Sequence, residues 1–275
     1  MVLKTLIKIY FFILLLIAPV YSQAEESVKA RLNEKNSTLT YSPLVFSDGS
    51  NLTLVTPQQF KTLTRQLSFV VQELHQRLKS IFGNIPQFST SIHLMEESKF
   101  FSETNAPEWT NAIYYKNKII IPIPQNLREI NYKSIVRAVQ HEYTHAVVNA
   151  LSKGRCVGWL DEGLAQWAEG YESKSLQKAL IKQLRSGSLI PLSMLQGGFT
   201  GLKPEVVPVA YAQSLYLTRA IINHFGFLPL RTYFKALRIG YSQEAAFIAA
   251  FNVNESLMEA IGTKKLLKKF RVYRQ

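Results

Sequence analysis

Apolar and polar residues follow two different periods along this chain, and the period changes near residue 130. Before that point, alternating stretches predict strands at 37–46, 51–55, 91–95, 112–115 and 118–121. One long segment between the second and third strands has helical spacing instead, with apolar residues at Leu63, Leu67, Val70, Val71, Leu74, Leu78 and Ile81. We expect this helix to begin at Thr56-Pro57, with Thr as N-cap and Pro at the first helical position, and to stop before Gly83.

After residue 130 the pattern is almost entirely helical. It predicts helices at 130–151, 161–172, 173–184, 210–225, 229–237, 242–251 and 254–270. The segment 186–205, rich in Gly and Pro, is expected to be a loop that borders a cleft and moves. The sequence therefore predicts an α+β fold, with a small N-terminal β-sheet and one long helix followed by a helical C-terminal half.

The helix predicted at 130–151 contains the residues His141-Glu142-Tyr143-Thr144-His145, which match the pattern H-E-x-x-H. Histidines four positions apart lie one turn apart on the same helix face, so both imidazoles can reach one metal ion. Glu142 lies beside the first histidine, where it can take a proton from a water activated by the metal. Because so short a pattern also arises by chance, the interpretation requires a third ligand.

Glu162 is the candidate third ligand, 17 positions after His145 and near the start of the next predicted helix. A loop followed by an antiparallel helix would point that first turn at the two histidines. Two imidazoles and one carboxylate form a zinc site that leaves a coordination position open. Glu169 lies two turns further on the same face, and we expect it to accept a hydrogen bond from a metal-binding histidine. The alternative for both glutamates is a solvated helix face, which the flanking apolar residues make less favourable for Glu162.

With its W-L-x-E-G-x-A-x-x-x-E-G segment after H-E-x-x-H, the stretch 141–170 resembles the gluzincin zinc metallopeptidases, and especially the small peptidase MA-like domains. The resemblance covers about residues 91–226. It implies that His141, His145 and Glu162 bind one Zn²⁺ per chain, that Glu142 is the general base and that Glu169 supports a ligand. It also implies a gluzincin-like catalytic domain, which we place at 25–275, with 227–275 as a helical C-terminal extension.

A second match to this group begins at Tyr211. The segment Tyr211-Ala212-Gln213-Ser214 resembles its Y-x-x-G/S helix, which here ends at Gly226. The tyrosine of the aminopeptidase branch stabilises the oxyanion of the tetrahedral intermediate, so the resemblance implies that Tyr211 has this catalytic role. The alternative is an aromatic side chain that only packs at a helix end.

The G-x-M-E-N motif, with which the aminopeptidases of this group capture a free substrate amine, is absent. Aminopeptidase activity is therefore not implied, and we expect an endopeptidase. The strand in the equivalent place reads Trp109 to Tyr115, and Ala112 and Ile113 in it would pair with an extended substrate backbone. This strand is also one arm of a hairpin with 118–121, turning at Lys116-Asn117, and both interpretations can hold together.

The N-terminus has the pattern of a secretory signal peptide, which we place at residues 1–24. Lys4 and Lys8 are followed by an apolar segment at 9–20 and by small residues at Ser22 and Ala24. The pattern predicts export to the periplasm or the extracellular space. The alternative is an uncleaved anchor, for which the apolar segment is short, since a membrane span needs about 20 residues.

The net charge of +13 falls to +11 once Lys4 and Lys8 are removed with the signal peptide. Part of the excess lies near the C-terminus, at Lys264, Lys265, Lys268, Lys269, Arg271 and Arg274. Such a helix would lie on an anionic membrane or envelope surface or bind an acidic polymer, unless it is simply the outer face of a packed helix. Nothing in the sequence resembles a nucleic-acid-binding motif.

Cys156 is the only cysteine, so the chain forms no intramolecular disulfide. As a fourth metal ligand it would close the site, and we expect a buried apolar filler instead. The remaining histidines, His75, His93 and His224, have no partner at ligand spacing and are interpreted as structural or surface residues.

These features together predict an exported zinc-dependent metallopeptidase that acts on peptides or proteins. One alternative is a protein-binding module that keeps a peptidase fold without turnover. Another is a zinc amidase that acts on a cell-envelope substrate through the same chemistry.

Overall fold

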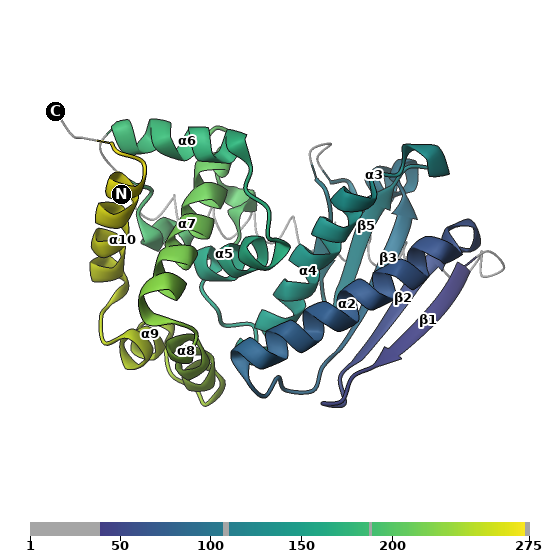
Figure 1. Cartoon of the computed structure of the whole chain (residues 1–275), viewed down its shortest axis with the longest axis horizontal. Coiled ribbons are helices and arrows are strands. Elements are labelled where there is room, and N and C mark those ends of the chain that lie inside the picture. The colour runs from purple at the N-terminus through teal and green to yellow at the C-terminus, as the bar shows by residue number, and fades with distance from the viewer. Residues whose placement is uncertain (1–38, 107–109, 187–188, 273–275) are drawn as a thin grey trace, which may run out of the picture.

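The computed structural model describes residues 39–106, 110–186 and 189–272. Within them a five-stranded sheet is followed by a mostly helical half (Figure 1), which confirms the α+β prediction. The predicted signal peptide at 1–24 and Trp109 lie outside the described residues. No helix in the described ranges is both long enough and apolar enough to cross a membrane.

The sheet has the strand order β1-β2-β3-β5-β4. Its strands are β1 (Leu39–Val45), β2 (Asn51–Pro57), β3 (Ser89–Glu96), β4 (Ile113–Tyr115) and β5 (Lys118–Ile123). The three central strands are parallel, whereas β1 and β4 pair antiparallel at the two edges. Leu54, Ile92 and Ile119 lie opposite one another across the central strands, and all three are fully buried. The register therefore turns one continuous apolar face toward the interior.

The long helix α2 (Lys61–Phe82) begins later than its sequence predicts, so the predicted start at Thr56-Pro57 is wrong. Strand β2 continues through Pro57, and a 3-10 turn at Gln58–Phe60 separates it from the helix. The Thr56 side chain does not cap the helix. Its hydroxyl is buried and lies 2.6 Å from the Thr64 hydroxyl. Pro57 is the last residue of β2 and lies beyond Val55, where the pairing of β2 with β3 ends.

The remaining helices form a layer along the sheet and a separate group beside it (Figure 1). They are α3 (Glu97–Thr104), α4 (Tyr132–Ser152), α5 (Gly158–Glu169), α6 (Lys174–Arg185), α7 (Val207–Phe225), α8 (Leu228–Arg238), α9 (Gln243–Phe251) and α10 (Glu255–Lys269). Helix α4 contacts α2 and β5 on one side and α5 and α8 on the other. It is therefore the element that joins the sheet to the helical half.

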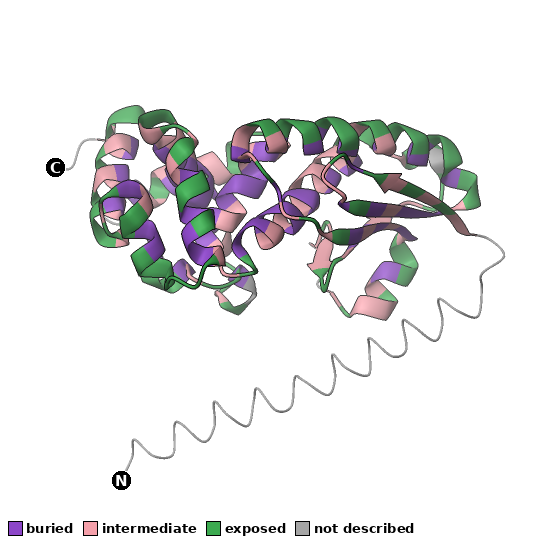
Figure 2. Ribbon diagram, turned by 90° about the horizontal axis from the view of Figure 1, so that it is seen from below, coloured by how far each residue is buried: buried purple, intermediate pink, exposed green. Residues whose placement is uncertain are grey.

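Buried side chains run without a break from the sheet into the helical half (Figure 2). The largest fully buried ones include Trp159 in α5, Tyr143 in α4 and Tyr233 in α8. Close-packed interiors of this kind have low compressibility. The first turns of α5 and the centre of α4, where the predicted ligands lie, are consequently held by packing on both sides.

Candidate metal centre

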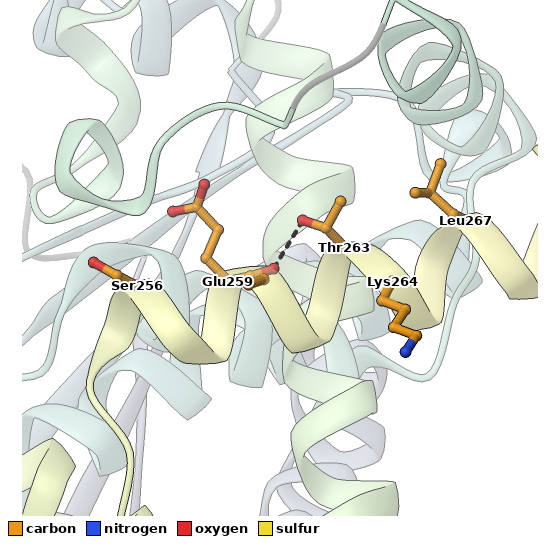
Figure 3. Close-up of a pocket in the computed structure, with 6 residues that line it drawn as sticks. Ser256, Glu259, Thr263, Lys264 and Leu267 are labelled. Atoms are coloured by element: carbon orange, nitrogen blue, oxygen red, sulfur yellow. Dashed lines mark hydrogen bonds between the residues drawn. The ribbon is translucent and has the colours of Figure 1, made fainter. Parts of the chain in front are cut away.

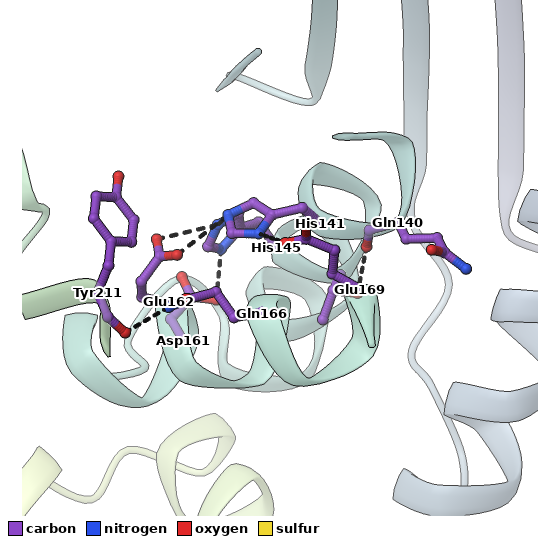
Figure 4. A network of polar contacts seen from close by, with 9 residues as sticks. Gln140, His141, His145, Asp161, Glu162, Gln166, Glu169 and Tyr211 are labelled. Atoms are coloured by element: carbon purple, nitrogen blue, oxygen red, sulfur yellow. Dashed lines mark hydrogen bonds and ion pairs between the residues drawn. The ribbon is translucent and has the colours of Figure 1, made fainter. Parts of the chain in front are cut away.

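The three predicted ligands converge from two helices (Figure 4). His141 and His145 lie on α4, and their Nε2 atoms are 3.2 Å apart. Glu162 in α5 approaches them with Oε1 3.3 Å from His141 Nε2 and Oε2 3.7 Å from His145 Nε2. The side chains are only 13–18% exposed. Among the described residues these three form the group of side chains able to hold a metal ion.

The other nitrogen of each imidazole faces a second carboxylate. His145 Nδ1 lies 2.9 Å from Asp161 Oδ1, and His141 Nδ1 lies 3.4 Å from Glu169 Oε2. A carboxylate accepts a hydrogen bond here, so each Nδ1 carries hydrogen, and Nε2 is the nitrogen that a metal ion would bind. Two lone pairs 3.2 Å apart repel unless a cation, either a proton or a metal ion, lies between them.

The spacing of the ligand atoms suits zinc. A tetrahedral zinc ion with bonds of about 2.0–2.1 Å separates neighbouring ligand atoms by about 3.3 Å. The two shortest separations are 3.2 and 3.3 Å. Glu162 Oε1 is buried and has no hydrogen-bond partner among the described residues. Buried oxygen atoms are normally paired, so this atom is suited to bind a cation. The residues present therefore fit a zinc ion.

The charges of the site also favour a cation. Burial opposes protonation of His141, but the negative charge of Glu162 raises its pKa well above the ordinary value. The same competition, with Asp161 as the main carboxylate, raises the pKa of His145 to about 9. Burial disfavours the ionised form of Glu162, yet the two imidazoles lower its pKa. The centre thus stabilises positive charge on its imidazoles and negative charge on its carboxylate.

Glu142 follows the first ligand on α4, and its side chain is half-buried. Burial raises the pKa of its carboxyl, while the neighbouring charges of His141 and His145 partly offset that increase. A carboxylate whose pKa moves toward neutrality is better matched to proton transfer near neutral pH than an ordinary one. Its environment therefore suits the predicted general base.

Tyr211 comes to the centre on α7, beside Glu162 (Figure 4). Its carbonyl accepts a hydrogen bond of 2.8 Å from the Gln166 side chain of α5. Burial raises the pKa of its phenol, and the charges of Glu162 and Glu142 raise it further. The ring of Phe199, from the loop at 186–205, packs edge-on against the Tyr211 ring at 5.3 Å. The segment 186–205, predicted as a loop that borders a cleft, thus contacts Tyr211 through Phe199; its residues 187–188 lie outside the described residues.

Ile113 begins β4, and Ala112 lies just before it, so the predicted substrate-binding pair is at the edge of the sheet. β4 packs against α4. The hairpin prediction is confirmed by the pairing of β4 with β5. Lys116 and Asn117 form its turn with positive φ angles of 45° and 65°. Two such residues are typical of a tight hairpin turn.

The opposite side of α4 is anchored by a buried chain of hydrogen bonds that the sequence did not reveal. The Tyr143 hydroxyl lies 2.8 Å from His75 Nδ1, and His75 Nε2 lies 2.8 Å from Asp48 Oδ2. His75 is fully buried and stacks on Phe46 at 4.0 Å, and burial lowers its pKa. Tyr143 lies between the two histidine ligands in sequence, so this anchor sets the rotation of the helix that carries them.

Asp161 was also missed. It lies one position before a ligand, in the first turn of a helix, where an acidic residue is common for reasons of helix stability alone. The sequence signal that could have identified Asp161 was its spacing of 16 positions from His145. Cys156 does not belong to the group of candidate ligands, and burial raises the pKa of its thiol.

The chain matches a known protein family over most of its length. The pattern of the Peptidase MA superfamily matches residues 70–268. The chain belongs to this superfamily. The predicted resemblance to a gluzincin peptidase MA-like domain is thereby confirmed. No curated protein matches the chain.

Solved structures similar to this superfamily member include an M1 zinc metallopeptidase from Deinococcus radiodurans, at 12% identity and a TM-score of 0.44. That comparison covers 83% of this chain and 51% of the other. An aminopeptidase N family protein from Idiomarina loihiensis has 12% identity and a TM-score of 0.45, covering 75% of this chain and 43% of its own. The chain thus spans about half the length of these proteins or less.

Proposed function

We propose that this protein is a zinc-dependent metallopeptidase that hydrolyses peptide bonds. The observation that carries the proposal is the convergence of two imidazole Nε2 atoms and Glu162, with the other nitrogen of each imidazole facing Asp161 or Glu169. Zinc held by His141, His145 and Glu162 supplies a Lewis acid that polarises a carbonyl and makes water a nucleophile at neutral pH.

The chain's own residues move the protons. Glu142 accepts a proton from the attacking water and returns it to the leaving amine. The raised pKa of its carboxyl supports both steps, because the group must be able to hold the proton between them. Tyr211 donates its phenolic hydrogen to the oxygen that becomes negative in the transition state.

We further propose that the substrate is an extended peptide, cut within its length. The backbone of Ala112 and Ile113, at the edge of the sheet next to α4, is suited to pair with such a peptide. The absence of G-x-M-E-N supports an endopeptidase, although one similar structure is described as an aminopeptidase N family protein. The N-terminal pattern at 1–24 supports export to the periplasm or the extracellular space.

The test is zinc content and turnover of the purified protein on a peptide library. We expect one zinc per chain, lost in His141→Ala and in His145→Ala. Glu142→Gln should keep zinc and fold but reduce turnover by roughly 10²–10⁴-fold, because an amide accepts no proton. Glu162→Gln should instead weaken zinc binding. Full zinc in both histidine variants would show that the ligand assignment is wrong.

Two added measurements, peptide binding and turnover of cell-envelope amides, separate the two alternative functions. Peptides that bind but are never cut, by a zinc-loaded protein, would identify a binding module on a peptidase fold. Cleavage of a cell-envelope amide, with no peptide in the library cut, would identify a zinc amidase. Either result would replace the peptidase proposal.

A further inference from the structure

Helix α6 carries a row of basic residues on one face. Lys174, Lys178, Lys182 and Arg185 follow one another at intervals of three or four positions, and all four are exposed. Leu180 and Leu184 on the opposite face are buried against the core. The helix contains no acidic residue. Its outward face therefore presents positive charge along its whole length.

The C-terminal part of α10 continues this charge. Its basic residues are Lys264, Lys265, Lys268 and Lys269, followed by Arg271 just beyond the helix. The acidic residues of α10, Glu255 and Glu259, lie at its beginning and are partly buried. Glu255 accepts hydrogen bonds from the side chains of Trp159 and Gln196, and Glu259 accepts one from the backbone N–H of Leu192. Charges of opposite sign are thus separated along this helix.

Both helices pack on α7, at the end of the molecule away from the sheet (Figure 1). Lys269 Nζ lies 4.5 Å from the centre of the Tyr216 ring, and the Phe270 ring lies 5.1 Å from it. We call the nine residues Lys174, Lys178, Lys182, Arg185, Lys264, Lys265, Lys268, Lys269 and Arg271 the basic face. Across the described part of the chain, none of the nine forms an ion pair.

A recess of about 400 Å³ lies along α10 beside this face (Figure 3). Its lining combines Lys264 and Glu259 with Ser256, Thr263, Ala260 and Leu267. The recess therefore carries both signs of charge, whereas the basic face beside it carries only positive charge.

We propose that the basic face docks this protein on an anionic phospholipid bilayer. Seven of its nine charges are lysines, which act as point charges without the planar geometry that arginine uses to recognise one particular phosphate group. Such a face suits a broad charged surface. Each basic residue near an anionic bilayer contributes about fivefold to partitioning. The proposal is independent of catalysis. It extends the surface predicted from the C-terminal segment to include α6. Arg274, which belonged to that prediction, lies outside the described residues.

The test is co-sedimentation of the full chain with vesicles of phosphatidylcholine alone or mixed with phosphatidylglycerol. We expect stronger binding to the mixed vesicles than to phosphatidylcholine alone, with the difference shrinking as salt is added. The variant Lys174→Gln/Lys178→Gln/Lys182→Gln/Arg185→Gln should partition roughly 600-fold less. The triple variant Lys264→Gln/Lys268→Gln/Arg271→Gln should also bind the mixed vesicles more weakly than the unsubstituted protein does. The apolar segment at 9–20 would bind both kinds of vesicle, and Lys4 and Lys8 beside it would favour the mixed ones. The loss of binding in the two variants therefore reports the basic face, because both variants keep that segment.

The matched control is Lys61→Gln/Arg65→Gln/Arg128→Gln/Lys235→Gln, which removes four exposed charges outside the basic face. It should keep most of the binding. Equal loss in this control would overturn the proposal, because net charge alone would then explain the attraction. Binding to polyglutamate with no preference for anionic vesicles would overturn it too, and would assign the face to an acidic polymer.

Discussion

Asp161 and Glu169 each face one of the two histidine ligands, but at different distances. The contact from His145 to Asp161 is 2.9 Å, within hydrogen-bond range, whereas that from His141 to Glu169 is 3.4 Å. Carboxylates in this position fix the imidazole tautomer and make the nitrogen a better ligand. Asp161 is therefore the stronger support, although only Glu169 was expected from the sequence. A carboxylate in the first turn of a helix can stabilise the helix end, and next to a ligand it can also orient a histidine. Residue type alone does not distinguish these two roles.

Asp161→Asn should weaken zinc binding by roughly 10–100-fold, because the amide still accepts a hydrogen bond but brings no negative charge to His145. Competition between the protein and a chelator of known affinity measures this directly. Glu129→Gln, at an exposed position in a neighbouring turn, is the matched control and should leave affinity unchanged. Unaltered affinity in Asp161→Asn would reduce the contact to a helix-end interaction.

Tyr211→Phe should lower turnover by roughly 10²–10³-fold, because it removes one hydrogen bond to the oxyanion while keeping the ring. Zinc content and melting temperature should barely change, since that bond forms mainly in the transition state. Tyr216→Phe is the control: it lies in the same helix but packs against Phe270 of α10. Small and equal effects in both variants would make Tyr211 a packing residue.

At the scale of elements, the approach of α5 to α7 depends on one glycine. A Cβ on Gly163 would lie 2.0 Å from Thr218 Oγ1 and 2.4 Å from the Ser214 carbonyl oxygen. Backbone oxygen cannot move aside as a flexible side chain can. Gly163 directly follows Glu162, so the contact that brings α7 and Tyr211 close also sets the position of this proposed ligand.

Gly163→Ala should therefore lower the free energy of unfolding by about 1–3 kcal/mol, as overpacking in a dense core does, and weaken zinc binding as Glu162 is displaced. Chemical denaturation and zinc titration measure the two effects. At Gly198 an added Cβ meets nothing within 4 Å, so Gly198→Ala should change neither quantity appreciably. A stable, fully zinc-loaded Gly163→Ala protein would contradict this account of the packing.

Most helices and strands were predictable from the sequence, because strong periodicity needs no tertiary information. The residues at which they begin and end were not predictable in the same way. Thr56-Pro57 matches a helix start, yet the ladder of β2 and the Thr56–Thr64 contact place it in a strand. The start of α5 at Gly158 was missed for a similar reason, since its N–H donates to the Gln196 carbonyl, which lies far away in sequence. Pairings over such distances decide where elements begin, and local pattern does not contain them.

At the scale of the whole molecule, burial keeps two histidines away from their charged form. Burial lowers the pKa of His75, and it lowers that of His93 to about 4. A histidine with a lowered pKa in the folded state contributes stability above its unfolded pKa of about 6.5. That contribution is lost as the pH falls from about 6.5 toward the folded pKa, because the unfolded chain then binds protons that the folded chain excludes.

His93→Gln should therefore reduce the acid sensitivity of folding. Each such histidine contributes up to about 1.4 kcal/mol per pH unit in that window. Urea unfolding of the unsubstituted and variant proteins at pH 7 and pH 5, in the same metal state, isolates the His93 contribution. His224→Gln, at an exposed position, should leave the pH dependence as it is. Identical pH dependence in all three proteins would mean that His93 stays accessible to protons.

His141 Nε2 and His145 Nε2 lie 3.2 Å apart, so a proton bound by the imidazoles must leave before zinc can bind both nitrogens. In the metal-free protein at neutral pH, a pKa of about 9 keeps His145 protonated. Zinc needs both lone pairs, so each ion that enters should release about one proton or more to the buffer. The calorimetric heat of zinc uptake should then vary with the ionisation enthalpy of the buffer, and affinity should rise between pH 7 and pH 9. A heat independent of buffer would mean that the imidazoles are already neutral. Proton release thus makes metal loading of this protein depend on the acidity of its surroundings.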